Sequence, residues 1–223
     1  MSHPLFSLEG KFAAISGCTR GIGRSMAIAL AEAGADIADQ DSVNKAMDGI
    51  LSVFPTLDIL VNNAGVQRRH PSVSFPEEDW DLVIQCNLKS VWTLSQAAGK
   101  VMVARQSGKI INIGSLLSFQ GGVTVPAYAA AKGAVATLTK ALSNEWASCG
   151  INVNAIAPGY IATEMNSALM KDSNRSEAIL SRIPAGRWGD PNDFKGPVIF
   201  LASRASDYMN GEVMLVDGGW MGR

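Results

Sequence analysis

The chain has 223 residues, of which 47% are hydrophobic and 17% are charged, and its formal net charge at pH 7 is −1. These values are typical of a globular protein, and the length favours one large domain. The near-zero charge gives no electrostatic basis for binding nucleic acid or an anionic membrane surface. We find no uncharged apolar run of about 18 residues and no signal-peptide pattern at residues 1–4. Cys18, Cys86 and Cys149 show no paired spacing and fit a reducing compartment, so we expect the cytoplasm.

The predicted elements alternate between strands and helices along the chain. Short apolar runs that end at glycine, proline or a polar residue predict buried strands, and longer stretches with apolar residues three or four apart predict helices. In chain order we expect a strand at 12–16, a helix at 21–33, a strand starting at 34–37, a helix at 42–54, a strand at 57–61, a long helix at about 77–105, a strand at 110–113, a helix at 126–148, a strand at 151–157, a mobile helical flap at 163–183, a helix at 192–203 and a last strand at 213–216. This alternation predicts an α/β fold with a doubly wound, Rossmann-type parallel sheet, three layers deep, in a single domain over 1–223.

A glycine-rich turn joins the first strand to the first helix. Gly17, Gly21 and Gly23 follow the strand at 12–16 and open the helix. Glycine permits a tight turn and a close approach of the backbone to a pyrophosphate, whose charge the helix N-terminus stabilises. An ordinary glycine-rich turn is the alternative, and the strand before and the helix after it favour the phosphate site.

A tyrosine, a lysine and a serine form the candidate catalytic group. Tyr128 and Lys132 are four residues apart in an alanine-rich helix, which places their Cβ atoms about 5–6 Å apart on one face. We expect the ammonium to lower the pKa of the phenol and to make Tyr128 an acid/base group. Ser115 ends a strand, where it can donate to a substrate oxygen or simply cap a turn. Asn87 is placed mid-helix, where asparagine is mildly unfavourable, and this inconsistency hints at function.

In this order, together with Asn62-Asn63-Ala64-Gly65 and with Pro158-Gly159 before Thr163, these residues resemble the short-chain dehydrogenase/reductase family. The resemblance runs from about residue 8 to residue 223. It implies a catalytic tetrad of Asn87, Ser115, Tyr128 and Lys132, with Asn87 holding a water in a proton relay. It also implies a nicotinamide cofactor, for which we expect NAD and leave NADP open. The implied cofactor contacts are Gly17, Thr19, Arg20, Gly21, Ile22, Gly23, Asn63, Ala64, Gly65, Tyr128, Lys132, Pro158, Gly159, Ile161 and Thr163.

Within the family, the strings at 64–69, 116–122, 183–189 and 217–220 are similar to those of dehydrogenases that act on sugar acids. The resemblance implies a small sugar-acid substrate contacted by Ser115, Gln120, Tyr128, Arg68 and Arg69. Two adjacent arginines are either a carboxylate clamp or a solvated face. A reductase of acyl-carrier-protein substrates is a more distant alternative. A cofactor-sensing regulatory protein is the non-enzyme alternative, although such proteins typically lack the tyrosine or the lysine.

Other potential sites carry weaker signals. His3 and His70 have no metal-ligand spacing around them, so we expect no metal. The helices at 77–105 and 126–148 are apolar over more than one face, with Val91, Trp92, Leu138 and Trp146 in surplus for one core. By resemblance, both helices form a two-fold interface, and we expect a homotetramer.

One stretch is too short for the family's fold. The strand that begins at 34–37 is followed at once by the start of the helix at 42–54. A βαβ unit takes about 30 residues, so we expect a strand–helix–strand segment to be missing near 37–38, with a break in the chain there or within 36–41. The missing part is where an acidic or a basic residue would select NAD or NADP at the adenosine ribose.

Overall fold

A parallel β-sheet forms the centre of the computed structural model, which describes residues 3–40, 49 and 55–223. Within these residues, six strands follow the order β2-β1-β3-β4-β5-β6, and every neighbouring pair is parallel. The strands are β1 (Phe12–Ser16), β2 (Asp36–Gln40), β3 (Ile59–Asn62), β4 (Gly108–Ile113), β5 (Ile151–Pro158) and β6 (Val213–Val216). The chain leaves β1 for β2 on one side and returns to β3 on the other. Open α/β sheets bind ligands at the carboxyl ends of the strands beside such a switch point.

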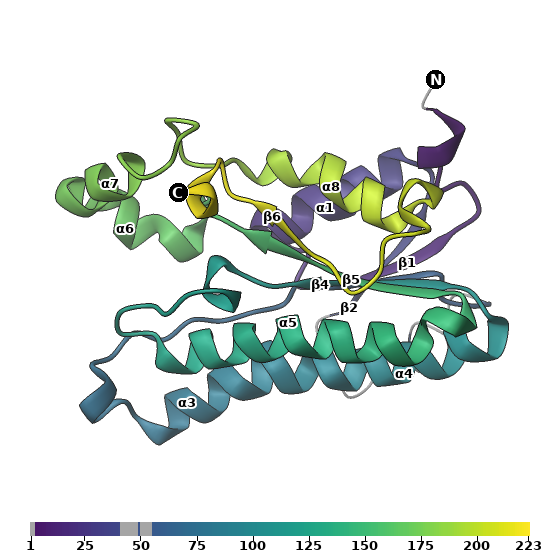
Figure 1. Cartoon of the computed structure of the whole chain (residues 1–223), viewed down its shortest axis with the longest axis horizontal. Helices are drawn as coiled ribbons and strands as arrows, with labels where there is room; N and C mark the ends of the chain where they lie inside the picture. Colours follow the sequence, from purple (N-terminus) through teal and green to yellow (C-terminus); the bar gives the residue numbers. More distant parts are fainter. Residues whose placement is uncertain (1–2, 41–48, 50–54) are drawn as a thin grey trace.

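Helices cover both faces of the sheet, which confirms the predicted doubly wound, three-layer fold (Figure 1). The helix α1 (Gly21–Glu32) packs beside α8 (Lys195–Ala202) on one face. The other face carries α4 (Ser90–Arg105) and α5 (Pro126–Trp146), with α3 (Glu77–Ile84) leading into α4. The short helices α6 (Ser167–Lys171) and α7 (Ser173–Leu180) project at one end, where the flap was predicted. The helix that we predicted at 42–54 lies outside the described residues.

Two apolar clusters fill the spaces between the layers. Successive strand residues point to opposite faces of a sheet, so Ile15 joins the cluster under α1 and α8, whereas Ala14 joins the cluster under α4 and α5. Phe194 and Met102, one in each cluster, are fully buried. Burying such a side chain stabilises the fold by about 1.5–3 kcal/mol, so both helical layers are fixed firmly to the sheet.

The long helix predicted at 77–105 is present but contains a π-helical turn. This turn, η3 (Gln85–Lys89), separates α3 from α4. Asn87 lies in it with no exposed surface. Single π turns inside α-helices are frequent at functional sites, and this one aims the Asn87 side chain at the loop that follows β3.

The short stretch near residue 37 forms a continuous edge strand. Phe12 to Ser16 of β1 pair in register with Asp36 to Gln40 of β2, so the chain passes through Ile37 and Ala38 without a break. The expected gap between these two residues is therefore not present in this structure. Within the described residues, β2 pairs only with β1. On the side of the switch point where the adenosine of a dinucleotide would bind, the sheet therefore extends beyond β1 by one strand.

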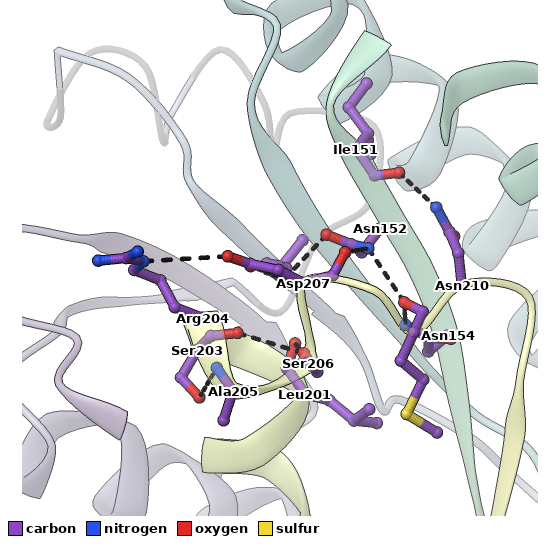
Figure 2. A network of polar contacts seen from close by, with 12 residues as sticks. Ile151, Asn152, Asn154, Leu201, Ser203, Arg204, Ala205, Ser206, Asp207 and Asn210 are labelled. Carbon is purple, nitrogen blue, oxygen red and sulfur yellow. Dashed lines mark hydrogen bonds and ion pairs between the residues drawn. The ribbon is translucent and has the colours of Figure 1, made fainter. Parts of the chain in front are cut away.

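A polar network fixes the chain segment that leads into β6 (Figure 2). The Asn152 amide donates to the carbonyls of Asp207 and Met209, both at 3.0 Å. Asn210 donates to the Ile151 carbonyl at 2.9 Å and accepts from the backbone N–H of Val153 at 2.8 Å. These contacts lie at the amino end of β5. They fix the position at which β6 begins. Because β6 runs parallel to β5, it then leads the carboxyl-terminal residues toward the carboxyl ends of the strands.

Candidate active site

The glycine-rich turn after β1 is shaped for close approach by a phosphate group. Gly17 and Gly21 have φ values of +68° and +56°, in the left-handed region that favours glycine. A Cβ atom added at Gly23 would lie 2.2 Å from the Gly17 carbonyl oxygen. Arg20, the N-cap of α1, makes no side-chain capping bond. The N–H groups of the first turn are thus left for an anion, and the turn fits the pyrophosphate of a dinucleotide.

The loop after β3 is tied to this turn by side-chain bonds. Asn63 donates its amide to the carbonyls of Ser16 and Gly17 at 3.1 and 2.8 Å. The Ser16 hydroxyl accepts from the backbone N–H groups of Asn63 and Ala64, both at 3.1 Å. The amide of Asn63 therefore has a structural role, and it holds the 63–65 loop beside the phosphate turn. Of the other predicted cofactor contacts in the turn, Thr19 is exposed and Ile22 packs against the core under α1.

The segment after β5 lies against the same turn. Pro158 ends β5, and Ile161 pairs with Gly189 in an isolated parallel bridge. The Thr163 methyl carbon would be 3.6 Å from a Cβ atom at Gly21. Next to Thr163, Glu164 forms an ion pair with Arg20 across the two segments. The structure thus brings the predicted phosphate and nicotinamide contacts together at one edge of the sheet.

Tyr128, Lys132 and Ser115 meet at the carboxyl end of β4. The Lys132 ammonium lies 5.6 Å from the centre of the Tyr128 ring and donates to the Ile113 carbonyl at 2.6 Å. Ser115 is the N-cap of η4 (Leu116–Ser118), where its hydroxyl accepts from the backbone N–H of Leu117 at 3.2 Å. Ser115 also forms a side-chain hydrogen bond with Tyr128. Ser115 therefore caps this turn, as one of the two predictions had it, while its side chain lies beside the Tyr128 phenol.

The electrostatics of the pair differ from our expectation. Burial raises the pKa of the Tyr128 phenol, against the opposing effects of its hydrogen bond with Ser115 and of the Arg69 charge. The predicted lowering by Lys132 is therefore wrong for the protein without cofactor, because loss of water around the phenolate outweighs the nearby positive charges. Burial also lowers the pKa of Lys132 to about 8, partly offset by Cys86.

Asn87 makes three hydrogen bonds with backbone groups. Its amide nitrogen donates to the carbonyls of Val66 and Val83 at 2.9 and 2.8 Å, and its oxygen accepts from the N–H of Val66 at 3.2 Å. A Cβ atom at Gly65 would lie 2.7 Å from that oxygen. Asn87 thus holds the loop after β3, and among the described residues it makes no direct bond to Lys132.

The two adjacent arginines have different surroundings. Arg68 pairs with Asp79 at 3.0 Å, and His70 contacts the same carboxylate at 2.6 Å. Arg69 has no carboxylate within ion-pair distance among the described residues, and its guanidinium hydrogen-bonds only to Gln67, at 3.0 Å. Burial lowers the pKa of Arg69, as does the charge of Arg175, whereas the phenols of Tyr160 and Tyr128 act in the opposite direction. Arg69, unlike Arg68, therefore has no carboxylate partner among the described residues, and its charge lies within electrostatic range of the Tyr128 phenol.

Sequence reasoning missed the groups that complete this side of the site. Tyr160 and Arg175 lie within electrostatic range of Arg69, and neither was a candidate. Tyr160 directly follows the Pro158-Gly159 turn, and that position was the available signal. Gln120, which was a candidate, is partly buried in the loop after η4. Within the described part of the chain, no group of three or more His, Cys, Asp or Glu residues could hold a metal ion. No helix among these residues is both long enough and apolar enough to cross a membrane.

Comparison with known proteins identifies the family of the chain. The family model of enoyl-(acyl carrier protein) reductases matches residues 35–221. The 2-dehydro-3-deoxy-D-gluconate 5-dehydrogenase of Pseudoalteromonas atlantica is 53% identical over 250 residues, covering 98% of both chains, and that of Escherichia coli (strain K12) is 48% identical over 248 residues, again covering 98% of both chains. The crystal structure of a gluconate 5-dehydrogenase from Burkholderia cenocepacia, in complex with NADP and tartrate, superposes with a TM-score of 0.94 at 41% identity and 98% coverage of both chains. A structure from Agrobacterium tumefaciens with bound NADP, described as a candidate 2-deoxy-D-gluconate 3-dehydrogenase, gives a TM-score of 0.90 at 47% identity and covers 99% of this chain and 100% of that one.

The fold and the site define a nicotinamide-dependent oxidoreductase with a Rossmann-type sheet. At these identities and coverages the assignment is specific: the chain belongs to the short-chain dehydrogenase/reductase family. The family uses NAD or NADP, and the structural neighbours named above contain NADP. The 250 positions matched to the P. atlantica protein exceed the 223 residues of this whole chain by 27, so at least that many positions have no counterpart within it.

Proposed function

We propose that this protein transfers a hydride between a nicotinamide cofactor and the secondary hydroxyl or ketone of a sugar acid. The observation that carries the proposal is the meeting of Ser115, Tyr128 and Lys132 beside a glycine turn shaped for pyrophosphate, with the charge of Arg69 in electrostatic range of the phenol. The sequence strings are most similar to 2-deoxy-D-gluconate 3-dehydrogenase. The curated relatives are named 2-dehydro-3-deoxy-D-gluconate 5-dehydrogenase, and gluconate 5-dehydrogenase is the nearest alternative.

In the oxidation direction, Tyr128 takes the proton of the substrate hydroxyl while Ser115 orients the same oxygen by a hydrogen bond. When bound, the cofactor supplies the hydride acceptor. Burial disfavours the phenolate in the protein alone, so positive charge must favour it during the reaction. Within the part of the chain that the structure describes, Lys132 and Arg69 are cations placed to do so. Lys132 would also bind the nicotinamide ribose, and Asn87 would complete the proton relay through a water.

Arg69 is the residue that we assign to the substrate carboxylate. Guanidinium pairs carboxylates through two parallel hydrogen bonds, and Arg68 already has such a partner in Asp79. The B. cenocepacia relative was crystallised with tartrate, a hydroxy acid. This supports a site that accepts small hydroxylated acids.

We also propose that the chain lacks a strand–helix–strand segment at about residues 37–38. The 27 positions without a counterpart are close to the size of a βαβ unit of about 30 residues, and β2 stands as an edge strand. Such a chain would bind the adenosine half of the cofactor weakly and would discriminate poorly between NAD and NADP. Peptide mapping of the purified protein by mass spectrometry across residues 34–45 tests this, since additional residues there would show a complete segment.

Assembly as a homotetramer is a further part of the proposal. Of the apolar residues that the sequence suggested for the interface, Val91 is buried, and Leu138 and Trp146 are partly buried against the cluster under α4 and α5. Trp92 is 37% exposed on α4, and Trp80, on α3, is 39% exposed. These two indoles support an interface over α3 and α4. A cytoplasmic location is proposed on the free thiols of Cys86 and Cys149.

The function is tested by incubating the purified protein with NAD or NADP and a panel of sugar acids that includes 2-deoxy-D-gluconate and D-gluconate. Formation of reduced nicotinamide, followed by its absorbance, is the expected result with at least one acid. Binding of NADH without turnover of any acid or corresponding keto acid would instead favour a cofactor-sensing regulatory protein.

A further inference from the structure

Tyr160, whose phenol lies within electrostatic range of Arg69, belongs to an aromatic cluster built from three separate parts of the chain. The Tyr160 ring lies 4.7 Å from the Trp220 ring and 5.7 Å, edge to face, from the Trp188 ring, measured between centroids. Arg182 also stacks over Trp220, with its guanidinium carbon 4.0 Å from the ring centroid. Such contacts stabilise a fixed ring orientation beyond the burial of area alone. Tyr160 is thus held on two sides.

The turn at the carboxyl-terminal end of the chain places Trp220 against Tyr160. Gly218 and Gly219, at φ +66° and +91°, make the turn before η9 (Trp220–Gly222). The Asp217 carboxylate accepts from the backbone N–H groups of Gly219 and Met221 at 2.8 and 2.9 Å. The network at the amino end of β5 fixes the start of β6, so the whole stretch from there to Trp220 is positioned from both ends. The string at 217–220 resembled those of sugar-acid dehydrogenases, but the sequence indicated no role for it. In the structure it positions Trp220 beside Tyr160.

The polar groups of the cluster are not all satisfied within the protein. Trp220 is 6% exposed, yet its indole N–H has no hydrogen-bond partner among the described residues. Burial of an unpaired donor is unfavourable, so stability alone does not explain a tryptophan here. The Tyr160 hydroxyl likewise makes no hydrogen bond to a described residue, while its ring is packed and its phenol lies within electrostatic range of Arg69.

We propose that Tyr160 is a specificity-determining residue whose hydroxyl donates a hydrogen bond to the substrate carboxylate paired with Arg69, and that Trp220 is the positioning residue that holds Tyr160 there. The inference rests on the proposed function, since it needs an acid as substrate. A guanidinium and a phenol at one end of the substrate would leave its secondary hydroxyl for Ser115 and Tyr128. Two donors on one carboxylate also explain how the site selects an acid with one guanidinium, that of Arg69.

The test compares Tyr160→Phe with Tyr208→Phe, which removes the same hydroxyl from a fully exposed tyrosine outside the site. For D-gluconate, or whichever acid the parent enzyme turns over best, we expect Tyr160→Phe to lower kcat/KM about 10- to 100-fold, because a hydrogen bond to a charged group is worth that range. The loss should appear in KM, with kcat changed less than about threefold. The neutral polyol of the same acid should show no loss, and the dissociation constant of NADH, measured by fluorescence, should not move.

Two variants of Trp220 distinguish a role in positioning Tyr160 from a role in folding. Trp220→Ala should raise KM for the acid in the same direction as Tyr160→Phe. Trp220→Phe keeps an aromatic ring beside Tyr160 and removes the unpaired N–H, so it should restore KM to within about threefold of the parent without lowering Tm. An acid KM unchanged in Tyr160→Phe, or an equal loss for acid and polyol, overturns the inference while leaving the proposed function intact. A parent enzyme that turns over no sugar acid at all overturns both.

Discussion

The phosphate turn offers a substitution with a calculable outcome, Gly23→Ala. The added methyl would lie 2.2 Å from the Gly17 carbonyl oxygen and 2.3 Å from the Asn63 amide nitrogen. These two atoms are hydrogen-bonded to each other at 2.8 Å, so the methyl must push both apart and break that bond. Overpacking costs about 1–3 kcal/mol and the lost bond about 0.5–1.5 kcal/mol, against a gain of about 1 kcal/mol from alanine in a helix. We expect the free energy of unfolding to fall by about 1–3 kcal/mol.

The same displacement should weaken cofactor binding, since the backbone N–H groups of this turn would no longer converge on a phosphate. We expect the dissociation constant for NADH or NADPH, measured by fluorescence titration, to rise at least about tenfold. Gly133→Ala is the matched control. It lies inside α5, and its added methyl would meet nothing within 4 Å, so stability should rise by about 0.5–1 kcal/mol with unchanged affinity. If Gly23→Ala binds cofactor as tightly as the Gly133→Ala protein, the turn is not the pyrophosphate site.

Three further predictions concern charge and assembly. Because the pKa of Lys132 falls from its ordinary value of 10.5 to about 8 on folding, the unfolded chain binds more protons than the folded one between these pH values, and the free energy of unfolding should rise with pH across that window. Urea unfolding of the ligand-free protein should show this rise, of about 3 kcal/mol relative to Lys132→Met, and equal slopes for the two proteins would contradict the assignment. Arg69→Ala should lower kcat/KM for acids by the equivalent of about 2–5 kcal/mol and spare neutral polyols. Arg68→Ala removes a partly exposed pair with Asp79 and a hydrogen bond to the Gln67 carbonyl, and it should leave the preference for acids unchanged. Equal effects of the two variants would refute the distinction. Light scattering at micromolar concentration should give the mass of a tetramer, and a monomer would rule out the interface over α3 and α4.

The periodic parts of the fold were predictable because local pattern and tertiary packing agree in them. The strand at 12–16 and the helix at 126–148 coincide closely with β1 and α5, since the first is a short apolar run that ends at glycine and the second is a long alanine-rich stretch. The π-helical turn at 85–89 was not predictable, because it arises from the bonds of Asn87 to a loop that is distant in the sequence. The continuous strand through 37–38 also depends on a partner, β1, that pattern reading does not place.

In the candidate site too, local spacing was predictable from the sequence, whereas burial and distant partners were not. Spacing predicted that Tyr128 and Lys132 share a helix face, and the structure places the ammonium 5.6 Å from the ring centre. The direction of the Tyr128 pKa was predicted wrongly because spacing carries no information on burial, which dominates it. Arg68 and Arg69 could not be separated in the sequence either, because the partner of Arg68 lies in α3.

The central claim, that Tyr128 moves the proton in a nicotinamide-dependent oxidation of a sugar acid, is tested most directly by Tyr128→Phe. Turnover of the best acid and binding of NADH should be measured on the same preparation. The account predicts a loss of several orders of magnitude in kcat with an NADH dissociation constant close to that of the parent, because only the phenol can transfer the proton at that position. A Tyr128→Phe protein that retains turnover within about tenfold of the parent would contradict the account.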